Sequence, residues 1–206
     1  AQLNYTPTPL PDVVLRENAV ARLPGRLGKG LPPEEEFFQH TIGYESITMI
    51  QKEDKYLEVS TPDSKVRARD FIFEGIFINP SETGIPFDYG ILFRNQSANT
   101  QYRLMIIPKK HQWELSYWNE DKGTIEENID DGTFIGISPY ENNKNKVRVI
   151  AYQNKGWLYI NDGFVAEFTL LDNINGKISI ATDMMNNQVL DGRKIKCEKI
   201  KIWWNE

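Results

Sequence analysis

Cysteine and histidine are scarce in this 206-residue sequence, which contains one cysteine and two histidines. The single Cys197 cannot form an intrachain disulfide or a thiolate metal cluster, and two histidines disfavour a histidine-rich metal site. No run of about 18 apolar residues occurs, so no transmembrane helix is expected. A glycine-rich phosphate loop and the Gly-x-Ser-x-Gly and His-Glu-x-x-His motifs are also absent. These absences exclude a disulfide scaffold and the commonest nucleotide-binding and hydrolase signatures.

Clustered positive charge is absent as well. The formal net charge is −5 at pH 7, and the sequence has no long basic run. Its densest basic stretch, residues 193–196, places an isoleucine among the basic residues, which is typical of the solvated face of an edge strand. Nucleic-acid binding requires a clustered basic surface, so no nucleic-acid partner is expected.

Proline is concentrated at the start of the chain. Residues 1–36 hold six of the eleven prolines, which predicts an extended arm without sheet pairing, with a short helix at residues 12–22. We therefore divide the chain into this arm and a domain of residues 37–206. The first residue is alanine, and we expect a removed leader and an extracytoplasmic setting: secreted, periplasmic or cell-surface. The arm is expected to lie on its own domain or on a protein partner.

After residue 37 the pattern is almost entirely that of β-strands. Apolar and polar residues alternate in short segments, which are separated by stretches rich in Asn, Gly, Asp and Pro. The pattern predicts an all-β fold: a two-sheet antiparallel jelly-roll sandwich preceded by the proline-rich arm. The predicted strands are residues 56–60, 71–78, 89–94, 102–107, 113–118, 147–152, 157–160, 164–170, 177–182 and 195–204.

The clearest hairpin is GWLYINDGFVAEFTL, residues 156–170. Its Asn161-Asp162-Gly163 tip suits a two-residue turn, because these residue types tolerate positive φ. Its core contacts are predicted to come from both strands, with a register adjustment in the return strand. These contacts are Leu158, Ile160, Val165 and Phe168.

Four segments in order carry a family resemblance. They are FIFEGIFINP, FDYGILFRNQSANTQYRLMI, KVRVIAYQNKGWLYINDGFVAEF and GKISIATDMMNNQVLDGRKIKCEKIKIWW, which together span about residues 70–204. Their order resembles the concanavalin A-like lectin/glucanase superfamily, especially its laminin-G-like and sugar-hydrolase-like bacterial jelly-roll modules. The resemblance implies a fold and not an activity, because this fold hosts lectins, hydrolases and structural modules alike.

The catalytic pattern of the hydrolases in this superfamily is incomplete. The resemblance implies Glu-x-Asp-x-x-Glu on one strand, whereas Ser116 stands where the pattern has its aspartate after Glu114. Glu120 is about 20 Å from Glu114 along an extended strand, too far for a carboxylate pair that must lie about 5–5.5 Å apart. The acidic residues 126–131 are predicted to form a loop. We expect no catalytic residues, with an unrecognised or degenerate glycoside hydrolase as an alternative.

No cofactor is expected, although many lectins of this superfamily bind calcium. Calcium takes oxygen ligands from Asp and Asn side chains on loops. The candidate ligands are Asp130, Asp131, Asp172, Asn173 and Asn175.

Strand alternation provides a candidate binding surface. With the more apolar side chains placed between the sheets, a mixed set of charged and aromatic residues points outward and shares one face if its strands share one sheet. Met105, Ile107 and Ile150 point the same way and indicate a covered surface. The candidate binding residues are Glu74, Arg94, Arg103, Glu114, Trp118, Arg148 and Tyr152, with Ser116 among them.

Arginine and aromatic side chains suit both glycans and protein interfaces. The sequence therefore predicts a non-catalytic, lectin-like binding module that recognises a protein partner or a glycan through the outer sheet face. The alternative is a structural accessory subunit of a larger assembly, including one at a membrane, tethered by the arm. A third interpretation is an ordinary solvated sheet with incidental ion pairs.

Overall fold

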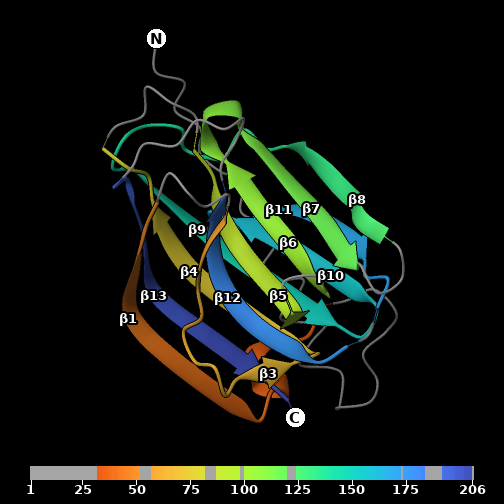
Figure 1. Ribbon diagram of the computed structural model, residues 1–206. Helices are drawn as coiled ribbons and strands as arrows, with labels where there is room; N and C mark the ends of the chain where they lie inside the picture. Colours follow the sequence, from red (N-terminus) through yellow and green to blue (C-terminus); the bar gives the residue numbers. More distant parts are fainter. Residues whose placement is uncertain are drawn as a thin grey trace.

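The computed structural model describes residues 32–51, 57–81, 87–97, 100–119, 124–172, 174–183 and 192–205. They form two antiparallel sheets packed face to face, in which β5, β6 and β7 lie in front of β9 and β10 (Figure 1). The predicted β-sandwich is confirmed. The predicted helix at residues 12–22 and most of the arm lie outside the described residues. No helix among the described residues is long and apolar enough to cross a membrane.

The strands alternate between the two sheets along the chain. Sheet A has the order β1 (His40–Ile50), β13 (Lys194–Trp204), β4 (Phe71–Ile78), β9 (Lys144–Tyr152), β10 (Lys155–Ile160) and β11 (Gly163–Thr169). Sheet B has the order β2 (Leu57–Ser60), β12 (Gly176–Asp183), β5 (Tyr89–Ser97), β6 (Thr100–Ile107), β7 (Gln112–Asn119) and β8 (Thr124–Thr133), and β3 (Arg67–Ala68) also pairs with β12. Two 3₁₀ turns are η1 (Glu35–Phe37) and η2 (Pro108–Lys110).

Strands β1, β3 and β8 were not predicted. Strand β8 contains the acidic residues 126–131, so their interpretation as a loop is wrong. Both β1 and β8 lie at sheet edges, where a strand pairs on one side only and its side chains can stay in water. Strand β8 has a run of acidic residues, and so it lacks the apolar alternation by which the other strands were predicted.

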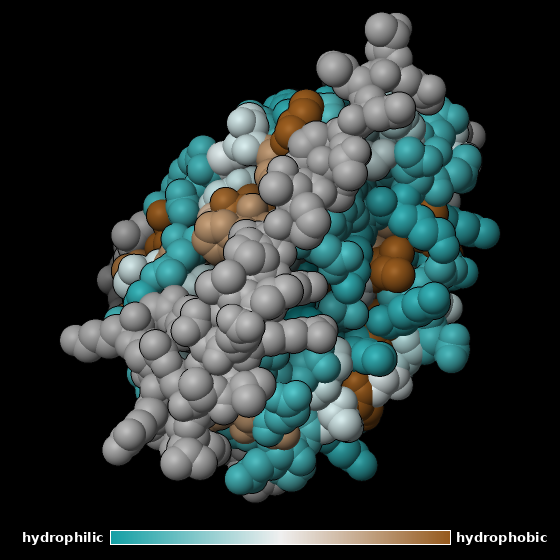
Figure 2. Space-filling model, turned by 180° about the vertical axis from the view of Figure 1, so that it is seen from behind, coloured by the Kyte–Doolittle hydropathy of each residue, from teal (hydrophilic) through white to brown (hydrophobic). Residues whose placement is uncertain are grey.

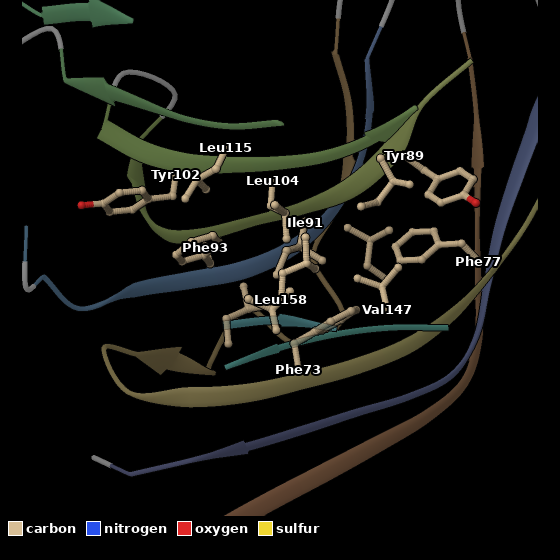
Figure 3. Packing of buried hydrophobic residues seen from close by; sticks show 14 of the residues in the cluster. Phe73, Phe77, Tyr89, Ile91, Phe93, Tyr102, Leu104, Leu115, Val147 and Leu158 are labelled. Carbon is tan, nitrogen blue, oxygen red and sulfur yellow. The ribbon is translucent and has the colours of Figure 1, made fainter. Parts of the chain in front are cut away.

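The core lies between the sheets and is rich in stacked aromatic rings. Phe77 stacks on Tyr89 with ring centroids 4.6 Å apart, and Phe93 stacks on Tyr102 at 5.1 Å. Such offset pairs add to the stabilisation that burial alone provides. The inward register predicted for β4, β5, β6, β7 and β9 is confirmed, and its residues converge from both sheets (Figure 3).

The hairpin tip has the geometry that its residues predict. Asn161 and Asp162 both have positive φ, 51° and 63°, and the register shifts between Leu158 and Tyr159. The Asn161 side chain accepts a hydrogen bond from the Lys146 backbone N–H at 2.8 Å and donates one to the Gly136 carbonyl at 2.8 Å. Asn161 therefore holds the tip against two other segments.

Replacing Asp162 should have little effect, because its exposed side chain makes one surface ion pair, with Lys146 at 2.8 Å. We expect Asp162→Ala to lower the free energy of unfolding by about 1 kcal/mol or less. Asn161→Ala should cost more, about 2 kcal/mol, because it leaves two partly buried backbone groups without this partner. Urea denaturation measures both. Equal losses would contradict the assignment of the anchoring role to Asn161.

Candidate functional site

The seven candidate residues do not share one face. Glu74, Arg148 and Tyr152 lie on sheet A, whereas Arg103, Glu114 and Trp118 lie on sheet B. The outward sides of the two sheets face opposite directions, so the expectation of one common surface is corrected. The cause is topological: β4 and β9 pair with each other and not with β5, β6 or β7.

Arg94 is the second correction, because it is not on an outer face at all. Its side chain is fully buried, and its guanidinium donates hydrogen bonds to three backbone carbonyls that are distant in sequence. Asp70 lies 3.8 Å away and offsets the buried charge. Desolvation lowers the pKa of Arg94. The three acceptors are the carbonyl oxygens of Arg69 (3.0 Å), Gln153 (2.5 Å) and Asp172.

A β-bulge explains why alternation failed at this position. Arg94 has a φ of 47°, and the pairing of β5 with β6 shifts register between Phe93 and Ser97. The backbone of β12 comes so close that a Cβ on Gly176 would lie 2.2 Å from the Arg94 carbonyl carbon. Glycine is therefore required at position 176, and Arg94 serves the fold.

The outer face of sheet A is occupied by the chain itself. Residues 33–38, which we call the strap, cross this face and lead into β1. The Arg148 guanidinium donates to Glu35 of the strap at 2.8 Å and to Glu74 at 3.4 Å. The Phe37 ring packs edge-on against Tyr152, with centroids 5.3 Å apart. Arg148 and Tyr152 therefore contact the strap directly, and Glu74 contacts Arg148.

An apolar cluster lies under the strap. Phe38 packs with Ile150 and Trp157 on the outer side of sheet A, and the ring of Trp203 lies against this cluster. Ile150 is 3% exposed, which confirms that its outward position is covered. Seen from behind, the coloured atoms show small separate apolar areas and no single broad patch (Figure 2).

The outer face of sheet B holds the other candidates. We call Arg103, Glu114, Ser116 and Trp118 the Trp118 face. The Arg103 guanidinium carbon lies 4.1 Å from the centroid of the Trp118 ring, within cation–π range. Glu114 is exposed, and Ser116 is half-buried directly across from Arg103. Leu92, Met105 and Ile107 point to the same side of the sheet and are buried, as expected for Met105 and Ile107.

Sequence reasoning missed one residue of this face. Asp131 on β8 lies directly opposite Glu114 on β7 in the strand register. Its carboxylate accepts a hydrogen bond from the Asn128 side chain at 2.7 Å. The acidic sequence of β8 gives no strand pattern, so the sequence alone does not place Asp131 beside Glu114. Like charges placed opposite each other usually destabilise a sheet, so the pair is a feature that a ligand could use.

The candidate calcium ligands are partly committed to other contacts. The Asp172 carboxylate accepts hydrogen bonds from the Tyr117 hydroxyl and the Asn119 side chain. Within the described residues, no group of three His, Cys, Asp or Glu side chains could hold a metal ion. Asn173 lies outside the described residues, so calcium binding there stays an alternative hypothesis.

No protein-family model matches the chain, and no curated protein sequence is significantly similar to it. Solved structures with a similar fold include the carbohydrate-binding module CBM66 from Bacillus subtilis, which is 12% identical with a TM-score of 0.55 over 80% of this chain and 96% of that one. An Aspergillus kawachii β-fructofuranosidase is 11% identical with a TM-score of 0.55 over 81% of this chain and 27% of that one. The receptor-binding domain of botulinum neurotoxin type G is 13% identical with a TM-score of 0.50 over 82% and 42%. At these identities the similarity shows the fold.

Proposed function

We propose that this chain is a non-catalytic binding module that recognises a neutral glycan through the Trp118 face. The observation that carries the proposal is the stack of Arg103 on Trp118 beside the exposed Glu114. Aromatic rings pack against the apolar faces of sugars. A guanidinium supplies several N–H donors, and carboxylates accept from hydroxyl groups. The names of two proteins with a similar fold, a carbohydrate-binding module and a fructofuranosidase, support a sugar as the ligand.

The charges of the face favour a neutral sugar over an acidic one. One cation, Arg103, stands beside two carboxylates, Glu114 and Asp131, on adjacent strands. An acidic sugar would meet repulsion from both carboxylates. The setting that we propose for such a module is extracytoplasmic, where extended glycans occur.

Binding is favoured over hydrolysis by the exposure of the carboxylates. Glycosidases keep their acid protonated by removing it from water, whereas Glu114 and Asp131 are both exposed. The register nevertheless makes this pair the one to test for hydrolysis. Release of reducing sugar by the wild type that ceases in Glu114→Gln and Asp131→Asn would replace the proposed binding function with catalysis.

Trp118→Ala tests the proposal. We expect the wild type to be retarded in native gels containing a neutral β-glucan or β-fructan, and not in gels containing polygalacturonate. Loss of the ring should weaken binding at least tenfold, as expected for a central aromatic contact. Tyr152→Ala is the matched control, because it removes an aromatic ring from the opposite face. If no neutral glycan retards the wild type, or if Trp118→Ala binds normally, the proposal fails. Saturable capture of a purified protein that Trp118→Ala abolishes would identify a protein partner instead.

A further inference from the structure

The loop of residues 134–143 joins β8 of sheet B to β9 of sheet A at one end of the sandwich. It carries the two most exposed large apolar side chains among the described residues, Ile135 at 69% and Tyr140 at 70%. Single exposed apolar residues are common on protein surfaces. Two exposed apolar side chains on one short loop are less common and need an explanation. The way the loop backbone is held bears on it.

The loop is held by hydrogen bonds from four other segments. The Asn79 side chain donates to the carbonyls of Ser138 at 2.8 Å and Tyr140 at 2.7 Å. The Phe134 backbone N–H donates to the His111 carbonyl at 2.7 Å. Further anchors come from Asn145, whose side chain accepts from the Ser138 N–H at 2.7 Å and donates to the Ser138 carbonyl at 3.0 Å, and from Asn161, which donates to the Gly136 carbonyl.

Ile137 of the same loop is 1% exposed and packs in the core. The backbone around Ile135 is therefore fixed, and its exposed side chain is not a product of a loose loop. A contact surface that is ordered in advance loses little entropy on binding. The loop meets this condition for docking.

Two exposed lysines stand beside the loop. Lys109 and Lys110 form η2 and precede His111, whose carbonyl binds the loop backbone. Among the described residues neither lysine forms an ion pair, whereas Lys144 pairs with Glu198 at 3.2 Å and Lys146 with Asp162 at 2.8 Å. Within the part of the chain that the structure describes, two cations without an ion pair therefore lie beside the loop that carries the exposed apolar side chains.

We propose that this end of the molecule docks on an anionic lipid surface. Ile135 enters the boundary between headgroups and acyl chains, Tyr140 lies at the headgroup level, and the lysines of η2 contact the lipid phosphates and carboxylates. Tyrosine favours membrane interfaces, and basic side chains near an anionic leaflet strengthen attachment. The proposal does not depend on glycan binding, because it rests on different residues from those of the Trp118 face.

The single cysteine of the chain allows a direct test. Cys197 is fully buried, and burial raises the pKa of its thiol, so it should resist labelling under native conditions. Ile135→Cys in the full chain can then be labelled selectively with an environment-sensitive fluorophore. We expect its emission to shift to the blue with phosphatidylcholine vesicles that contain phosphatidylserine, and not with phosphatidylcholine alone. Raised salt should weaken the response, because it screens the lysines.

Vesicle flotation with two test variants and a matched control completes the test. Tyr140→Ser and Lys109→Gln/Lys110→Gln should each lower the bound fraction severalfold. Leu171→Ser should leave it unchanged, because Leu171 is similarly apolar and exposed but lies next to Asp172, beside the Arg94 end of β5. Absence of binding to anionic vesicles overturns the proposal. Binding without a change in emission at position 135, or binding that Tyr140→Ser leaves intact, also overturns it.

Discussion

Arg94→Ala should destabilise the protein more than Asp162→Ala, Asn161→Ala or Phe38→Ala. We expect the free energy of unfolding to fall by about 3–5 kcal/mol, the usual cost of breaking a buried charged contact. Three backbone carbonyls would lose their donor inside the protein, and Asp70 would lose a nearby positive charge. Each unsatisfied buried acceptor costs about 1–3 kcal/mol. Urea denaturation followed by far-UV circular dichroism measures the loss.

Arg94→Lys is the control for charge. An ammonium group keeps the charge but lacks the planar fork that reaches three carbonyls at once. We expect it to recover only part of the lost stability. A loss below about 1 kcal/mol in Arg94→Ala would show that the guanidinium contacts are as weak as those on a surface.

The second large effect is expected at the strap. Phe38 is 8% exposed and packs edge-on against Phe37 at 5.5 Å, over the cluster that contains Trp157. Phe38→Ala should lower the free energy of unfolding by about 3 kcal/mol, near the lower end for buried phenylalanine. It should also shift tryptophan emission to the red, because the indoles beneath the strap would meet water.

Glu35→Gln separates packing from charge in the strap. The substitution removes the ion pair between Glu35 and Arg148, two side chains that are both partly exposed. It leaves the rings of Phe37 and Phe38 in place. We expect a loss of about 1 kcal/mol or less and no change in tryptophan emission. If Glu35→Gln costs as much as Phe38→Ala, the strap is held by electrostatics and not by its rings.

The local sequence pattern correctly predicted the strands that are buried. The inward residues of β4 to β7 and of β9, and the positive φ at Asn161 and Asp162, follow from alternation and turn chemistry alone. Strand β8 was missed because an edge strand with exposed acidic residues resembles a loop. Its absence from the prediction also hid Asp131, so the pair with Glu114 remained invisible.

The candidate surface was harder to predict because it depends on non-local pairing. Alternation shows which side chains of a strand point outward, but not which strands share a sheet. Glu74 and Arg103 were therefore grouped, although they lie on opposite outer faces. Arg94 was misplaced for another reason: one bulged residue reverses the alternation after it, and no residue type in the sequence marks that bulge.

The contacts of Arg94 also bear on the rate at which the protein unfolds. Its three carbonyl partners belong to Arg69, Gln153 and Asp172, which are successively 84 and 19 residues apart along the chain.

 All three acceptors must be in place before the guanidinium can bind them.

Contacts that need distant segments to be assembled tend to form after the folding transition state, since closing long loops costs entropy first. Interactions absent from the transition state slow unfolding without speeding folding. Arg94 should therefore mainly lower the unfolding rate. It lengthens the lifetime of the folded sandwich and leaves the folding rate almost unchanged.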